Sequence, residues 1–323
     1  DGYNISSYNE KVRGNIVLVR EEADIVRAIA VEKFGAIGII TDKTESTEIR
    51  SDKELQDARV YQSFWWFGGE TKVFGFVISP SQGAALRKLL QETKVIVRAY
   101  VDAEFRDGEF SVLTGFIPGE SDKEIWVTSH LDHPKPGAED NASGVSVSLE
   151  IARTLNQLVS EGRIPQFEQG IRFIYMPEYI GTAAYAAYRY DDIKSGKIIG
   201  ALNLDMVGAD EKYGGALLII EPPYDQGSYA APLMRWLIDY LISTEKKFAG
   251  ADDVAMFRWG VSKFSAGSDY YILTDPVIGI NTVALNRWPY KYYHTSLDTI
   301  DKISTESLYR VGVLSAVFIG ILA

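Results

Sequence analysis

The chain has 323 residues, of which 46% are hydrophobic and 24% charged, a composition typical of folded globular proteins rather than disordered ones. Its 33 basic and 44 acidic residues give a formal net charge of −11, which disfavours nucleic acid and anionic membranes as partners. Cysteine is absent, which excludes disulfides, thiol nucleophiles and thiolate metal sites, whereas three histidines are present.

The first part of the chain predicts a small α/β unit. Short apolar runs rich in β-branched residues indicate strands, and apolar residues at helical spacing indicate helices. The expected strands are 14–20, 36–41 and 73–78, and the expected helices are 23–34 and 81–90. The polar stretch 42–59 is expected to be a surface loop. We place the domain boundary so that residues 1–93 form one domain and 94–323 the other.

The second part alternates strands with helices, which predicts a largely parallel sheet covered by helices on both faces. The expected strands are 95–102, 111–117, 125–129, 171–176, 198–206 and 281–285, and the expected helices are 144–159, 180–190, 229–243 and 304–322. No apolar run reaches the roughly 18 residues that a membrane span needs. We therefore expect the apolar residues 311–323 to form a buried terminal helix.

Potential ligands and acid–base groups gather where the predicted strands end. Ligand sites in open α/β sheets form at the carboxyl ends of the strands, so these side chains are expected to lie close together. Scattered surface charges would not show this placement. The residues are His130, Asp132, His133 and Asp140 after strand 125–129, Glu178 after 171–176, Asp205 in 198–206, and His294 and Asp298 after 281–285.

Imidazole and carboxylate groups together suit zinc or a similar divalent ion. Such an ion lowers the pKa of water toward about 7 and polarises a carbonyl group. A nearby carboxylate that is not a ligand can then accept the proton of the water. The sequence therefore favours a metal-dependent hydrolase.

The order of these motifs resembles the zinc aminopeptidase family, which has two co-catalytic metals. The resemblance covers residues 112–323 and rests on a His-x-Asp, an Asp before a helix, a Pro-Glu-x-x-Gly, an Asn-Leu-Asp-Met and a late Tyr-His-Thr. It implies a doubly wound, mostly parallel (mixed) α/β sheet with helices on both faces. The N-terminal part resembles the protease-associated domain that is often attached to these peptidases.

The resemblance also implies a role for each motif residue. Glu178 would be the general base, because Gly181 fixes the register of its motif. Zinc would be the cofactor, with one or two ions per chain and Co or Mn as substitutes. The ligands would be His130, Asp140 and Asp205 for one metal and Asp140 with His294 for the other, with Asp132 orienting His130 and a cis peptide bond between Asp140 and Asn141.

Two residues depart from the family pattern. Tyr179 stands where the family has a second Glu that binds the metal at His294, and a neutral phenol is a poor zinc ligand. His133 stands where a small polar residue is commoner, and it could fill the ligand gap, contact substrate or simply pack in its loop. A peptidase-like subgroup with His-x-x-His-Pro and Pro-Glu-x-x-Gly patterns is more similar to this chain.

The expected activity is that of a metal-dependent exopeptidase. An aminopeptidase acting on peptides through metal-activated water is favoured. One alternative is a carboxypeptidase of the same fold, whose cationic pocket could come from Arg287 and Lys291. A single-zinc glutaminyl cyclase would lack a ligand because of Tyr179, and a catalytically inactive binding protein is the third alternative.

Other features are less specific. Tyr292 and Tyr293 are expected either to line the substrate pocket or to pack in the core, and Asp298 to cap or support the site. No nucleic acid partner and no membrane span are expected, and a homo-oligomer is compatible with the 19 tyrosines. The compartment stays open, and the first residue, Asp1, suggests that something upstream was processed or left out.

Overall fold

A computed structural model describes residues 4–44, 49–65, 68–244 and 257–323. By its internal contacts the chain divides into two units. The first comprises Asp1–Asp107 and His294–Leu297, and the second comprises Gly108–Tyr293 and Asp298–Ala323. This division falls 14 residues after the boundary that the sequence analysis placed behind residue 93, and the assignment of 1–93 as a protease-associated-like domain stays a prediction.

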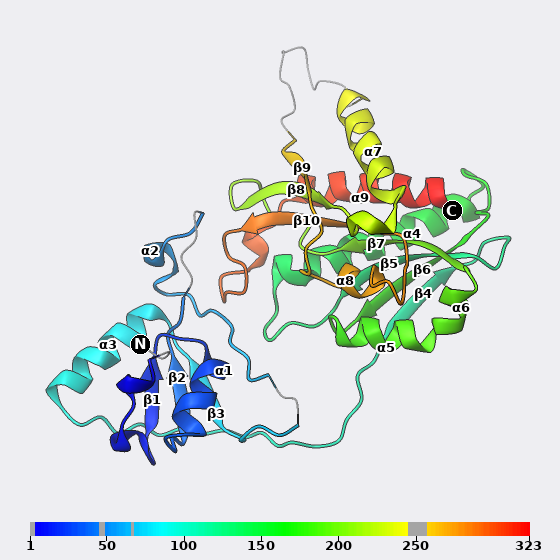
Figure 1. Ribbon diagram of the computed structural model, residues 1–323. Coiled ribbons are helices and arrows are strands. Elements are labelled where there is room, and N and C mark those ends of the chain that lie inside the picture. The colour runs from blue at the N-terminus through cyan, green and yellow to red at the C-terminus, as the bar shows by residue number, and fades with distance from the viewer. Residues whose placement is uncertain (1–3, 45–48, 66–67, 245–256) are drawn as a thin grey trace, which may run out of the picture. The chain divides into compact units, whose positions relative to one another are not determined.

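The first unit contains a three-stranded parallel sheet in the order β1-β2-β3 (Figure 1). Its strands are β1 (Ile16–Val19), β2 (Gly38–Thr41) and β3 (Phe74–Val77), and its helices are α1 (Ala23–Val26), continued by a π-helical segment (Arg27–Val31), α2 (Asp52–Leu55) and α3 (Pro80–Glu92). Val26, Ala30 and Ile39 are fully buried in its core. The elements expected there are present, but α2 interrupts the stretch 42–59 that was expected to be a loop.

The second unit is built on a seven-stranded mixed sheet in the order β4-β6-β5-β7-β10-β8-β9. The four central strands β6, β5, β7 and β10 are parallel, whereas β4 and β8 run antiparallel to their neighbours β6 and β10. The carboxyl ends of the four parallel strands therefore lie at one edge of the sheet. The strands are β4 (Leu113–Ile117), β5 (Glu124–His130), β6 (Gly170–Met176), β7 (Ile198–Leu204), β8 (Gly214–Ile220), β9 (Trp259–Ser262) and β10 (Thr282–Tyr290).

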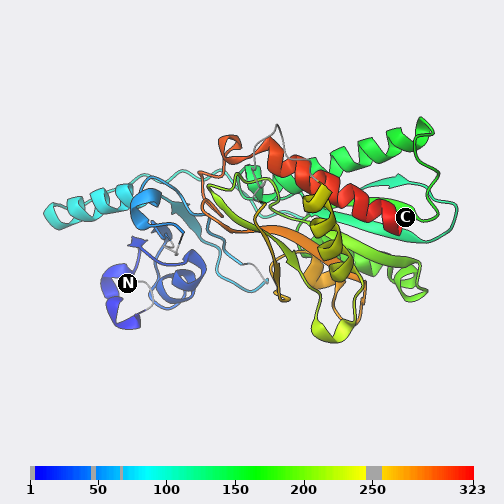
Figure 2. The same ribbon diagram turned by 90° about the horizontal axis from the view of Figure 1, so that it is seen from above.

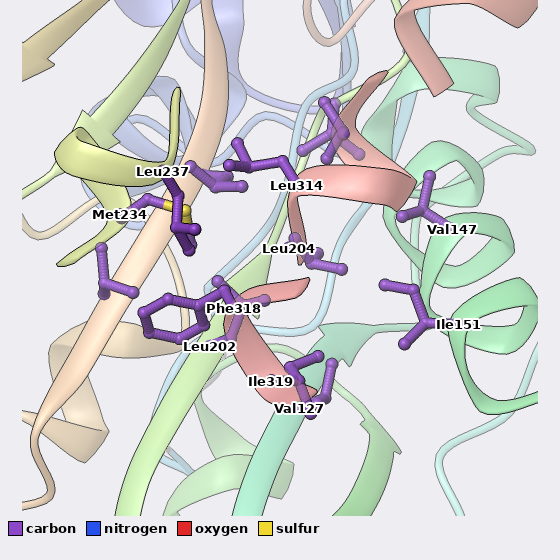
Figure 3. Packing of buried hydrophobic residues seen from close by; sticks show 14 of the residues in the cluster. Val127, Val147, Ile151, Leu202, Leu204, Met234, Leu237, Leu314, Phe318 and Ile319 are labelled. Atoms are coloured by element: carbon purple, nitrogen blue, oxygen red, sulfur yellow. The ribbon is translucent and has the colours of Figure 1, made fainter. Parts of the chain in front are cut away.

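Helices cover both faces of this sheet, as the sequence predicts (Figure 1). On one face lie α4 (Gly144–Ser160), α7 (Ala230–Thr244) and α9 (Thr305–Leu322), and on the other lie α5 (Ile180–Tyr188), α6 (Tyr190–Lys194) and α8 (Tyr270–Leu273). Alternate residues of one strand serve the two faces: Val127 of β5 packs with the first group of helices and Trp126 with the second. Figure 3 shows the first of these cores.

Helix α9 lies between α4 and α7 (Figure 2). Its 18 residues are long and apolar enough to cross a membrane by length and composition alone. However, Val311, Leu314, Phe318 and Ile319 of α9 are buried in the main core, with Leu202 and Leu204 of β7 beneath them (Figure 3). One face of α9 therefore belongs to the main core, as expected for the terminal helix, whereas 33% of the helix as a whole is buried.

Besides α2, the structure corrects the sequence-based expectation for three further strands. Residues 94–112 contain no regular secondary structure and are mostly exposed, so the strand expected at 95–102 is wrong. Alternating apolar residues form a strand only where a neighbouring strand completes their hydrogen bonds. Conversely, β8 and β9 were not predicted, although the apolar run 216–220 is a signal for β8.

Candidate metal centre

His130 is the last residue of β5, a strand whose seven residues are all buried. Its Nδ1 lies 3.1 Å from the backbone oxygen of Asp132. Its Nε2 lies 3.2 Å from Oδ1 of Asp140 and 3.3 Å from Oδ1 of Asp205. A backbone carbonyl can only accept, so Nδ1 carries a proton, and Nε2 faces the two carboxylates, where its lone pair would be available to a cation that displaces the second proton.

Asp140 lies in a short irregular helix, η4 (Ala138–Ser143), immediately before α4. The cis peptide bond that the resemblance implies between Asp140 and Asn141 is present. The Asn141 amide donates to the Leu204 oxygen at 3.0 Å and accepts from the Met206 nitrogen at 3.1 Å. Asn141 therefore ties η4 to the end of β7, where Asp205 follows.

Asp298 supports Asp140 from the other side. One of its carboxylate oxygens accepts from the Glu139 nitrogen at 2.9 Å, and the other accepts from the Asp140 nitrogen at 3.1 Å. The Tyr290 hydroxyl donates to the same carboxylate at 2.9 Å. The sequence analysis left open whether Asp298 caps a helix or supports the site. These contacts show that it holds the backbone on which Asp140 lies.

The donor set fits a zinc ion. Two ligand atoms about 2.0–2.1 Å from a tetrahedral zinc are about 3.3 Å from each other, close to the observed separations around His130 Nε2. Asp140 and Asp205 are only 4% and 5% exposed, and two buried carboxylates need a cation between them. Burial lowers the pKa of His130, but Asp205, Asp132 and Asp140 outweigh it and raise that pKa well above its usual range.

Glu178 follows β6 and lies next to this cluster. Its backbone nitrogen donates to Oδ1 of Asp132 at 2.7 Å, and that same oxygen lies 3.5 Å from Nδ1 of His130. Asp132 therefore links the histidine to the segment that carries Glu178. Burial raises the pKa of Glu178 to about 8; the negative charges of Asp205, Asp269 and Asp140 add to the effect and His130 opposes it.

The hydroxyl of Tyr179 is bound to a backbone oxygen and not positioned as a metal ligand. The backbone of Tyr179 has a positive φ of 55°, its nitrogen donates to Oδ1 of Asp269 at 2.9 Å, and its hydroxyl donates to the Ala266 oxygen at 2.8 Å. Burial and the charge of Glu178 raise the pKa of its phenol, which stays protonated. Asp269 is fully buried, and it holds the turn between Glu178 and α5 by accepting from the Tyr179 nitrogen and the Thr182 hydroxyl.

His133 has the same arrangement as His130. Its Nδ1 faces the backbone oxygen of Lys135, and its Nε2 lies 3.5 Å from Oδ2 of Asp140, the oxygen that His130 does not approach. Its side chain is 12% exposed. His133 and His130 therefore face the two different oxygens of the Asp140 carboxylate.

Three other predicted site residues are less central. Tyr292 and Tyr293 pack against a small apolar cluster of Met206, Ala209 and Tyr290, which is the core alternative named above. His294 begins the segment His294–Leu297, which groups with the first unit. The role of His294 as a metal ligand stays a prediction.

Comparison with known proteins agrees with this geometry. The profile of Peptidase family M28 matches residues 113–319, more than half of the chain. The chain belongs to this family. The M28 match covers the whole seven-stranded sheet and every candidate ligand of the second unit, so the strand-end motifs are those of a peptidase family.

Individual relatives are more distant. The chain is 29% identical over 199 residues to aminopeptidase YwaD of Bacillus subtilis, covering 59% of this chain and 39% of that protein. It is 30% identical over 141 residues to leucine aminopeptidase 1 of Ajellomyces capsulatus, covering 38% of this chain and 34% of that protein. It therefore spans well under two thirds of the length of these relatives.

A solved structure shows the same fold. The zinc aminopeptidase BSAP of Bacillus subtilis superposes with a TM-score of 0.64 at 20% identity, covering 98% of this chain and 72% of that chain. This confirms the mixed α/β architecture expected for an M28 protein. The ligand roles rest on this chain's own residues.

Proposed function

We propose that the chain is a metal-dependent aminopeptidase that removes the N-terminal residue of peptides. The observation that carries this proposal is the cluster of His130, Asp140 and Asp205 at the carboxyl ends of adjacent parallel strands, with Glu178 on the next strand end. Membership of a peptidase family and the aminopeptidase names of its relatives support it.

Zinc fits this cluster and would be held by His130, Asp140 and Asp205, with His294 as a further ligand predicted from the sequence. When bound, zinc would polarise the scissile carbonyl and lower the pKa of the attacking water. Glu178 takes a proton from this water as the new C–O bond forms. It then delivers that proton to the departing amine as the C–N bond breaks.

The residues around Glu178 set its position and proton affinity. Asp132 holds its backbone nitrogen, which places the start of the segment after β6 beside His130. In the absence of a cation, burial raises the pKa of the Glu178 carboxyl group to about 8, and a bound zinc would lower it again, so that the group could accept and release a proton near neutral pH. The chain thus supplies an acid–base group that is placed and tuned for peptide hydrolysis.

Of the two cations named for the carboxypeptidase alternative, Arg287 and Lys291, the first is not available to a substrate. A carboxypeptidase needs an exposed cation for the substrate carboxylate. The Arg287 side chain is fully buried, and its Nη1 donates to the Gly215 oxygen at 3.0 Å. Arg287 therefore cannot serve as that cation.

The first test is the variant Glu178→Gln, which keeps size but cannot accept the proton. We expect kcat to fall by about 10²–10⁴-fold, with the zinc content unchanged, because Glu178 is not a ligand. Activity is measured on aminoacyl anilides and zinc by elemental analysis. The control is Asp191→Asn, an exposed carboxylate on α6, which should leave both values unchanged. Full activity in the Gln variant would refute the role of Glu178.

A second measurement separates the two exopeptidase classes. The same peptide is supplied with a free amino end and an amidated carboxyl end, and with an acetylated amino end and a free carboxyl end. We expect cleavage of the first form only. Cleavage of the second form only would establish the carboxypeptidase alternative, and cleavage of neither by zinc-loaded protein would favour the inactive binding protein.

A further inference from the structure

We propose that His133 is a ligand of a second cation, which it shares with Oδ2 of Asp140. His133 would thereby take the place of the carboxylate that Tyr179 removes from the family pattern. The inference rests on the metal-dependent activity proposed above, because it assumes a first ion at His130. It assigns a function to a residue that the family pattern does not use.

The ring of His133 is oriented as the ring of a metal ligand would be. Nδ1 faces the backbone oxygen of Lys135, which can only accept a hydrogen bond, so Nδ1 carries the proton. Nε2 then faces Oδ2 of Asp140, and its lone pair would be available to a cation held between the two groups. Histidines that bind metals usually hold their second ring nitrogen in this way, because the hydrogen bond fixes the ring and its tautomer. His130 shows the same pattern with the Asp132 oxygen.

The two oxygens of the Asp140 carboxylate face two different histidines. Oδ1 lies 3.2 Å from Nε2 of His130, and Oδ2 lies 3.5 Å from Nε2 of His133. Both separations are close to the roughly 3.3 Å between two ligands of one tetrahedral zinc. Each oxygen is thus paired with a different histidine, which is the arrangement that a carboxylate bridging two ions requires.

The Asp140 carboxylate is also held in place and buried. The backbone nitrogen of Asp140 is held by Asp298, and the next residue, Asn141, is held by the Leu204 oxygen, so the segment that carries the carboxylate is fixed on both sides. Asp140 is 4% exposed, and its oxygens cannot turn freely toward water. A fixed, buried carboxylate between two imidazole nitrogens is preorganised for two cations rather than one.

Tyr179 does not compete with His133 as a ligand of the second cation. Its hydroxyl donates to the Ala266 oxygen at 2.8 Å, and its phenol stays protonated. The chain has replaced a charged oxygen ligand by a neutral nitrogen ligand. Nitrogen ligands favour zinc and cobalt over manganese and magnesium, so the second site should select the former pair.

The test counts metal ions on the purified chain. Apoprotein is dialysed against buffered Zn²⁺ and Co²⁺, and the bound metal is measured by elemental analysis. We expect two equivalents in the unaltered chain and one in His133→Asn, with the affinity for the second ion lowered by more than about 100-fold. Lys135→Ala, an exposed side chain in the same loop, is the matched control and should keep two equivalents.

A spectroscopic measurement avoids dependence on the variant's folding. The chain has only three histidines, so ¹⁵N-histidine labelling gives few signals. After loading with ¹¹³Cd²⁺, a bond between metal and nitrogen splits the ¹⁵N signal. We expect splitting at Nε2 of both His130 and His133. Splitting at His130 without splitting at His133 would overturn the inference, as would two full equivalents in His133→Asn.

These readouts also distinguish failure of the inference from failure of the proposed function. A chain that cleaves no peptide but loses one of two equivalents on substitution of His133 would support the ligand role and refute the activity. A chain that cleaves peptides with one equivalent, unaffected by His133→Asn, would support the activity and refute the ligand role.

Discussion

At the scale of single residues, the proposed metal centre depends on groups that would not themselves be ligands. Asp298 accepts from two consecutive backbone nitrogens, those of Glu139 and Asp140, and so fixes the backbone that carries the Asp140 carboxylate. We expect Asp298→Asn to lower zinc affinity by about 10–100-fold, because an amide can accept at only one of these positions and opposes the other with a donor. Competition with a chelating dye measures the affinity.

The matched control for this variant is Tyr290→Phe. It removes one hydrogen bond to the same carboxylate, worth about 1 kcal/mol, but leaves both backbone contacts intact. Its zinc affinity should change much less than that of Asp298→Asn. Equal affinities in the Asn variant and the unaltered chain would show that Asp298 has no part in positioning Asp140.

The residue scale also shows what a sequence can and cannot reveal. The ligand roles of His130, Asp140 and Asp205 stay predictions, but their convergence was predictable, because the end of a strand has a known location in an α/β sheet. The direction of the Tyr179 hydroxyl was not, since its partner Ala266 is 87 positions away in the chain. The contact of Asp269 with the Tyr179 nitrogen was hidden for the same reason, because it depends on α8 packing beside α5.

At the scale of elements, η4 is joined to the segment after β7 through a buried carboxyl group. Oε2 of Glu139 accepts from the Gly208 nitrogen at 2.9 Å, and the side chain is fully buried. Burial raises the pKa of Glu139 to about 8; hydrogen bonds from Ala209 and Gly208 and the charge of Arg287 oppose this shift. The folded chain therefore holds a proton here that the unfolded chain has lost.

This difference in proton binding predicts a dependence of stability on pH. Between the unfolded pKa of about 4.3 and the folded value of about 8, the native state binds more protons, so its stability falls as pH rises. Glu139→Gln cannot titrate and should gain stability relative to the unaltered chain from pH 5 to pH 8. Urea unfolding of both apoproteins at the two pH values measures this, and a constant difference would contradict the assignment.

The order of elements was largely predictable, and its failures have physical causes. The strands that carry the ligands are continuous apolar runs flanked by turn residues, which indicate buried parallel strands. The stretch 95–102 has the alternating pattern of a strand, yet the structure leaves it without a partner. Periodicity reports which residues suit a strand, whereas pairing depends on an available edge elsewhere in the fold.

At the scale of the whole molecule, the two units have separate cores, and the cluster around His130 belongs to the second. A ligand that binds only the folded state, present at a free concentration of about 1,000 times its Kd, adds about 4 kcal/mol to the free energy of unfolding. For a unit of this size, each kcal/mol corresponds to about 2–4 °C in Tm. Removing zinc with a chelator should therefore lower the Tm of the second unit by about 8–16 °C.

Hydrogen exchange would locate this effect. On chelation, protection should fall at the ends of β5 and β7 and in η4, because these segments meet at the ligands. The core of the first unit around Val26 and Ile39 contains none of these ligands and should keep its protection. Asp205→Asn should show a smaller shift in Tm, since its zinc affinity is reduced before chelation, whereas Glu178→Gln should show the full shift. A uniform loss of protection across both units would mean that zinc stabilises the chain as one cooperative body.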